Sequence, residues 1–162
     1  MDLSHHYLTI IINLKNITLV VIKKENLLQN ILAISLGMMI FFSFVLAPMI
    51  FKILDAENAG KFVRKIFPYY YLVNLFFLLI AIILFVIISS ISTHFYITLA
   101  LAISFIFAQF ILMPLINKLK DNNEEKKFKY AHGASVVINF VQMIGLISVS
   151  YTHLRAHETN VD

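Results

Sequence analysis

Four polar residues in the C-terminal third of the chain have the spacing of a single helical face. They lie three, four and three positions apart: His132, Ser135, Asn139 and Gln142. Residues three or four positions apart lie on the same side of an α-helix. Their amide and hydroxyl groups can hydrogen-bond a small solute, and a histidine can change its charge near neutral pH. This face is therefore a candidate binding pocket.

Three further polar residues interrupt otherwise apolar runs: Ser43, Asn74 and Gln109. At 1.5 Å per residue, Asn74 and Asn139 lie about 8 Å from the same end of the predicted helical bundle. Ser43, Gln109 and Gln142 lie about 12 Å from that end. We predict a polar pocket in this half of the bundle, with His132 at its mouth. Such side chains commonly do no more than hydrogen-bond between helices, at about 0.6 kcal/mol each. That structural interpretation is favoured over the pocket.

The rest of the chain has the composition of a membrane protein. Hydrophobic residues make up 60% and charged residues 14% of the 162 residues, whereas soluble chains are near one quarter charged. A helix needs about 20 mostly apolar residues to cross about 30 Å of hydrocarbon. The predicted spans are approximately residues 27–51, 69–91, 95–116 and 134–149, the last of them short. We expect an all-α membrane protein, a four-transmembrane-helix bundle.

Both ends of the chain fall outside these spans. Residues 1–26 are predicted to form an N-terminal arm, interfacial or poorly ordered, because Asn13, Lys15 and Asn16 interrupt its apolar run. Its Ile, Val and Thr content would equally suit a strand, and a fifth span is a further alternative. Residues 150–162 form a tail that resembles translated sequencing adapter. We expect the natural fourth helix to continue beyond residue 149 with a different sequence.

The basic residues predict the orientation. Segments 52–68 and 117–133 carry nine Lys and Arg residues, and the rest of the chain carries four. The positive-inside rule then places these two segments in the cytoplasm. We therefore expect a multi-pass protein of the bacterial cytoplasmic membrane with both termini outside.

The first of these segments has an amphipathic pattern of its own. Asp55 is a candidate N-cap, and the helix that it starts is predicted to end at Phe67, because a proline follows. We predict a short interfacial helix between the first and second spans that lies flat on the membrane. Three basic residues on one face would bind the membrane surface: Lys61, Arg64 and Lys65.

Several strings of the sequence, taken in order, resemble one known family. They are residues 36–42, 47–48, 58–60, 67–70 and 113–117, followed by Phe128 and the four polar residues of the C-terminal face. Over about residues 27–147 the chain resembles a bacterial domain-of-unknown-function family of small four-helix membrane proteins related to eukaryotic transmembrane protein 205. The resemblance implies a four-helix membrane fold and no established activity.

No pattern in the sequence indicates catalysis. The chain has no cysteine, no Gly-rich phosphate loop and no His-Glu-x-x-His, so we expect neither an enzyme, a cofactor nor a metal site. The first hypothesis is a non-enzymatic bundle that acts through the lipid bilayer, a second copy or another membrane protein, without nucleic acid. The alternative is a transporter of a small solute, a metal or protons that uses the polar pocket. A membrane redox or haem enzyme is the third, with His132 as the nearest axial ligand to a span.

Overall fold

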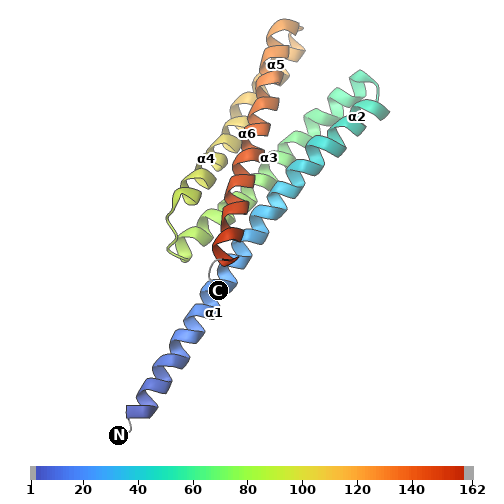
Figure 1. Cartoon of the computed structure of the whole chain (residues 1–162). Coiled ribbons are helices and arrows are strands. Elements are labelled where there is room, and N and C mark those ends of the chain that lie inside the picture. Colours follow the sequence, from blue (N-terminus) through green and yellow to red (C-terminus); the bar gives the residue numbers. More distant parts are fainter. Residues whose placement is uncertain (1–2, 159–162) are drawn as a thin grey trace.

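A computed structural model describes the backbone of residues 3–158 and the side chains of residues 9–150. All regular secondary structure in this part of the chain is helical, as predicted (Figure 1). The elements are α1 (Leu3–Phe41), η1 (Phe42–Leu46), α2 (Ala47–Ile53), α3 (Ala56–Ile87), α4 (Thr93–Phe107), η2 (Ala108–Leu112), α5 (Met113–Asp121) and α6 (Glu125–Glu158). The elements η1 and η2 are short π-helical segments inside longer helices.

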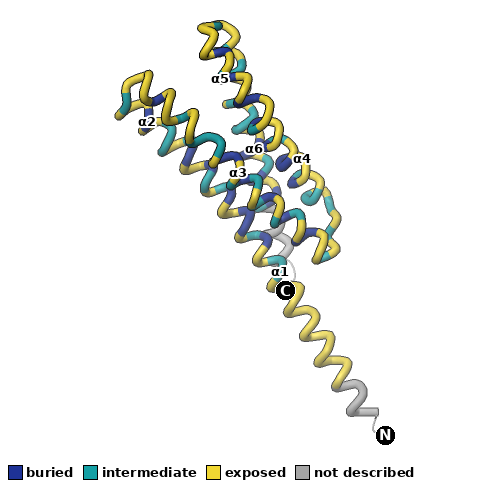
Figure 2. The backbone as a smooth tube through the Cα atoms, turned by 180° about the vertical axis from the view of Figure 1, so that it is seen from behind, coloured by how far each residue is buried: buried dark blue, intermediate teal, exposed yellow. Residues whose placement is uncertain are grey.

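The helices form two hairpins that pack side by side. In the first, α1, η1 and α2 run one way and α3 returns; in the second, α4, η2 and α5 run the same way as α1 and α6 returns (Figure 1). Both α1 and α4 pack against both α3 and α6. The core that they share includes Leu28, Leu78, Phe105 and Leu146, all fully buried. The hairpins are closest along this core and diverge toward α2 and α5 (Figures 1 and 2).

Most of the outer surface of the bundle is apolar. Four helical segments are long and apolar enough to cross a membrane, Thr9–Ile53, Ala56–Ile87, Thr93–Asp121 and Glu125–Ser150. Only 22% to 39% of the most apolar stretch of each is buried inside the bundle, and the remainder is exposed or of intermediate burial (Figure 2). An apolar surface of this extent fits lipid chains and not water.

The first helix begins far earlier than the sequence predicts. It passes through the expected boundary after residue 26 without a break, and residues 9–26 project beyond the bundle (Figure 2). Asn13 and Lys15 interrupt the apolar run, but neither interrupts a helical backbone, and the first Gly and Pro of the chain are Gly37 and Pro48. Residues 3–26 are therefore helical, so the strand alternative is wrong, whereas the predicted degree of order is untested. The interfacial location of this segment stays a prediction.

The predicted loop 52–68 is mostly helical as well. One helix, α3, runs from Ala56 to Ile87 with Pro68 inside it, so the predicted end of a separate interfacial helix at Phe67 is wrong. Proline removes one backbone hydrogen bond and disfavours a helix interior by about 3 kcal/mol. Aromatic rings pack beside this proline, because Phe67 and Tyr70 both contact Phe42, with ring centroids 5.1 Å and 4.3 Å away.

The fourth helix is longer than the predicted span. It starts at Glu125 and not at Ala134, and an acidic residue in the first turn favours a helix N-terminus. Asn123, in the short link from α5, has a positive φ of 56°, which asparagine tolerates well. Residues 125–150 extend over about 39 Å, although the apolar run 134–149 inside this helix covers only about 24 Å. Of the predicted tail, residues 150–162, the side chains beyond Ser150 lie outside the described part.

The two hairpins share a local design that the sequence analysis missed. Each outgoing helix contains a π segment, and each π segment is followed at once by a turn with proline, at Pro48 and at Pro114. Both sites have the pattern Phe-x-Leu-x-Pro-x-Ile, at residues 44–50 and 110–116. A proline ring crowds the carbonyl four residues before it. The wider π turn relieves this crowding, and it recurs at the same point of both hairpins.

The N-cap of α3 generates the first prediction. The carboxylate of Asp55 accepts the backbone N–H of Asn58 at 2.9 Å and that of Glu57 at 3.1 Å, and the hydrogen bonds from Asn58 hold the pKa of Asp55 below its usual value. Asp55→Ala should lower the midpoint of thermal unfolding by about 2–4 °C, measured in detergent, because the cap is lost.

The matched control is Asp55→Asn, which keeps an acceptor for the helix N-terminus and should unfold near the wild-type temperature at neutral pH. A carboxyl group whose pKa is lowered in the folded state stabilises the fold at any pH above its pKa in the unfolded state. This contribution is lost as the pH falls through its pKa in the folded state. The small advantage of wild type over Asp55→Asn should therefore disappear only below about pH 4. Equal stability of Asp55→Ala and wild type at pH 7 would contradict the capping role.

Candidate functional site

A chain of hydrogen bonds crosses the interior of the bundle. The hydroxyl of Ser35 on α1 donates to Asn74 Oδ1 on α3 at 2.8 Å, and Asn74 Nδ2 donates to the carbonyl oxygen of Tyr70. The Tyr70 hydroxyl donates to Asn139 Oδ1 on α6 at 2.6 Å. Asn139 Nδ2 then donates to Ser43 Oγ on η1 at 2.8 Å. Three helices of the bundle are joined in this way: the first helix (α1 and η1), α3 and α6.

The two glutamines of the predicted pocket have different surroundings. Gln142, which is 1% exposed, donates from Nε2 to Ser104 Oγ on α4 at 2.9 Å. This bond ties the fourth helix to the third. Gln109, on η2, has a buried Oε1 that no described group reaches. Its counterpart in the first hairpin is Ser43, which does have a partner.

The predicted polar pocket is thus two separate features. Ser43, Asn74 and Asn139 bond within one buried network, and Gln142 bonds to a neighbouring helix. These are the contacts expected of the structural interpretation. The remaining two residues of the C-terminal face, His132 and Ser135, line a cavity at the diverging end of the hairpins. Ser135 Oγ also donates to the His132 carbonyl oxygen of its own helix at 2.6 Å.

This cavity has a volume of about 710 Å³ and lies between the two hairpins. Its walls are the first turns of α3 and α6 together with α5 and the end of α2. Aromatic and aliphatic side chains line its inner part, among them Phe67, Tyr71 and Met113. A volume in the range of about 300–1,000 Å³ with mixed lining is typical of ligand sites. We take this cavity as the candidate site.

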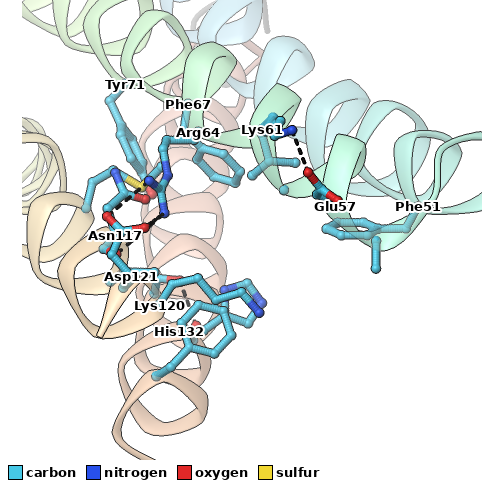
Figure 3. Close-up of a pocket in the computed structure, with 17 residues that line it drawn as sticks. Phe51, Glu57, Lys61, Arg64, Phe67, Tyr71, Asn117, Lys120, Asp121 and His132 are labelled. Atoms are coloured by element: carbon cyan, nitrogen blue, oxygen red, sulfur yellow. Dashed lines mark hydrogen bonds and ion pairs between the residues drawn. The ribbon is translucent and has the colours of Figure 1, made fainter. Parts of the chain in front are cut away.

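Two ion pairs lie at the outer part of the cavity (Figure 3). Lys61 Nζ lies 2.6 Å from Glu57 Oε1 within α3. Arg64 reaches across to α5, where its Nη2 lies 2.8 Å from Asp121 Oδ1 and 3.5 Å from the Asn117 carbonyl oxygen. This second pair connects the hairpins. Both pairs are largely exposed, so each contributes at most about 1 kcal/mol to stability.

The opposite wall carries basic groups beside an aromatic ring. Lys120 Nζ lies 5.1 Å from the centroid of the Phe128 ring, within range of a cation–π interaction. The His132 ring stacks on the same Phe128 ring, with ring centroids 5.8 Å apart and an angle of 7° between the ring planes. Figure 3 shows Lys120 and His132 close together on this wall. Neither forms an ion pair in the described part of the chain.

Of the three basic residues predicted to bind the membrane surface, two face the cavity. Lys61 and Arg64 line it, and each is held by a carboxylate. Lys65 is exposed and forms no ion pair with a described residue. Because all three belong to the continuous helix α3, they do not form the polar face of a separate flat helix.

The sequence analysis missed three cavity residues on α5. Lys120 and Asp121 lie three and four positions after Asn117. This spacing puts them on one helical face and could have identified them. The partners inside the bundle, Ser35 and Ser104, had no such signal, because a single Ser in an apolar helix says nothing about what it faces.

A metal centre has no support in the described residues, where no group of three or more His, Asp or Glu side chains lies close enough to hold an ion. His132 lies at the diverging end of the hairpins, whereas His94 lies in the first turn of α4 at the other end. The two histidines therefore cannot share one haem. The expectation that the chain is not an enzyme stays a prediction.

Comparison with known proteins places these features in a family context. Residues 31–125 match the family described as "Domain of unknown function (DUF4149)". An uncharacterized protein of Aquifex aeolicus (strain VF5) is 35% identical over 123 residues, which cover 75% of this chain and 89% of that protein. No solved structure matches the chain. The matched family segment contains α3 and α5 with most of the cavity wall, and it ends where α6 begins.

The buried network generates the second prediction. In a double-mutant cycle, Tyr70→Phe and Asn139→Ala should each destabilise the bundle and should show a coupling of about 0.6–1.7 kcal/mol, measured by unfolding in mixed micelles. Gln109→Leu serves as the control, because Gln109 Oε1 has no partner to lose, and it should be neutral or stabilising. Strictly additive effects of the first two substitutions would contradict the bond between Tyr70 and Asn139.

Proposed function

The chain belongs to the bacterial family that carries the DUF4149 domain of unknown function, and we propose that it is a non-enzymatic binding protein of the cytoplasmic membrane. In this proposal the four apolar helices cross the bilayer and the cavity between the hairpins receives a ligand or a partner. The observation that carries the proposal is the cavity of about 710 Å³ at the basic end of the bundle. Of the other predicted polar residues, all except Gln109 form hydrogen bonds inside the bundle.

The proposed orientation puts the basic end of the bundle in the cytoplasm. The short links 54–55 and 122–124 and the helix ends beside them carry the nine basic residues of segments 52–68 and 117–133. The link between α3 and α4, residues 88–92, has no basic residue. A bilayer holds such a chain with its basic end toward the cytoplasm. The predicted relation to eukaryotic transmembrane protein 205 also belongs to this proposal and rests on the resembling strings alone.

The alternative, transport of a small solute, a metal or protons, stays a prediction. It requires free polar groups along a path through the bundle, and three of its candidate residues are partners in one network: Ser43, Asn74 and Asn139. Nothing in the described part of the chain favours this alternative over binding at the cavity.

Cysteine labelling tests the orientation, because the chain has no cysteine of its own. Thr93→Cys lies at the start of α4 and Asn122→Cys lies between α5 and α6, and both positions are exposed. A membrane-impermeant maleimide should label Thr93→Cys in intact spheroplasts and Asn122→Cys only after lysis. The reversed pattern, or release of the chain from membranes by an alkaline wash, would overturn the proposal.

Charge reversal tests binding to anionic lipid at the basic end. The triple variant Lys61→Glu, Arg64→Glu and Lys65→Glu should retain severalfold less anionic phospholipid after purification in mild detergent, since each basic residue near an anionic surface is worth about 1 kcal/mol. The measurement is the ratio of anionic to zwitterionic lipid by mass spectrometry. The matched control reverses three lysines of the N-terminal arm: Lys15, Lys23 and Lys24. Equal losses in both triple variants would argue against a role of the basic end.

A further inference from the structure

The cavity lies at the level where a bilayer changes from hydrocarbon to headgroups. The helix α3 has 32 residues, about 48 Å, whereas the hydrocarbon is about 30 Å thick. With Ile87 at one boundary of the hydrocarbon, the other boundary falls about 20 residues earlier, near Pro68. Tyr71 is then inside the hydrocarbon, and Lys61 lies outside it among the headgroups. The cavity spans both levels.

The lining changes character along the same direction. On the hydrocarbon side Phe67, Tyr71 and Met113 face the cavity. On the headgroup side the cavity has charged and amide side chains, including Arg64 and Lys120 (Figure 3). An apolar inner part and a polar outer part fit a ligand of the same construction, an amphiphile. A uniformly polar solute would leave the inner part without a partner.

The charges at the outer part favour an anionic ligand. Three basic residues line it together with two acidic ones. Both carboxylates are already bonded to a basic residue, Glu57 to Lys61 and Asp121 to Arg64. In the described part of the chain, Lys120 contacts the Phe128 ring and forms no ion pair. An entering anion therefore meets an uncompensated ammonium group and further N–H donors, whereas an entering cation finds no free carboxylate.

We propose that the cavity binds one anionic phospholipid of the cytoplasmic leaflet, with an acyl chain against Phe67, Tyr71 and Met113 and its phosphate between Arg64 and Lys120. The volume of about 710 Å³ is in the range of ligand sites. The anionic surface of that leaflet supplies such a ligand. This inference rests on the proposed membrane placement.

Two glycines make a matched pair of variants for the test. Gly60 lines the cavity, and a Cβ added to it meets nothing within 4 Å. Gly37, on α1 outside the cavity lining, has equally open surroundings. Gly60→Phe therefore adds a bulky side chain at the cavity lining, where its Cβ meets no neighbour, and Gly37→Phe adds the same side chain elsewhere. Both substitutions remove a glycine from a helix, and the loss of that glycine by itself favours the helix.

The measurement is thermal unfolding of the purified protein in an uncharged detergent with added lysophosphatidylglycerol, lysophosphatidylcholine or inorganic phosphate. The anionic lipid at saturation should raise the unfolding midpoint of wild type and Gly37→Phe by about 5 °C. It should not raise the midpoint of Gly60→Phe. Equal shifts with both lipids, a full shift in Gly60→Phe, or the same shift with phosphate alone would each overturn the proposal, the last in favour of a free-anion site.

A charge variant keeps the test decisive if Gly60→Phe does not fold. Lys120→Gln should weaken the apparent affinity for lysophosphatidylglycerol about fivefold, and Lys126→Gln, exposed on α6 and outside the cavity lining, should leave it unchanged. Identical affinities of the two variants would overturn the inference. The cysteine-labelling pattern separates the two proposals, because it can hold while the lipid fails to bind.

Discussion

The hydrogen bond between Tyr70 and Asn139 holds together the most polar part of an otherwise apolar bundle. The interior of the bundle offers such groups no water, so hydrogen bonds within the protein stabilise them. Asn139 satisfies both ends of its amide, accepting from Tyr70 and donating to Ser43. Because these residues come from three different helices, their bonds fix how the helices are rotated about their own axes. The packing of the core follows from that rotation.

The same requirement explains how the prolines are accommodated. Pro68 stays inside α3 because a break there would free several backbone groups, whereas the ring itself removes only one donor. Pro48 and Pro114 each follow a π segment that shifts the backbone bonds by one residue. In none of the three places does the chain leave the helix. An apolar setting thus favours a distorted helix over a turn.

The number of apolar helices followed from composition and run length, and the structure agrees. The ends of the helices did not follow, because the sequence analysis treated polar residues as boundaries. Lys15 and Asn16 end an apolar run without ending α1, and Glu125 starts α6 well before the apolar run begins. Helix continuity depends on backbone geometry, which a polar side chain does not interrupt.

The candidate site was foreseen only in part, for a related reason. The spacing of Asn139 and Gln142 correctly predicts that they share a helical face, but it cannot tell which helices face them. Tyr70, which bonds to Asn139, looks in the sequence like an ordinary interfacial aromatic residue. The cavity itself arises from the divergence of two hairpins (Figure 1). That divergence is a property of the assembled bundle, so only His132 and Ser135 of the predicted pocket turned out to line it.

The paired π segments also have a mechanical meaning. Each lies beneath one wall of the cavity, and each is followed by a proline that withholds a backbone bond, so the two outgoing helices bend most easily there. Bending at the π segments would change the separation of the two cavity walls, which are α2 with the start of α3 and α5 with the start of α6. Because the two π segments share one sequence pattern, such bending would move both cavity walls by similar amounts.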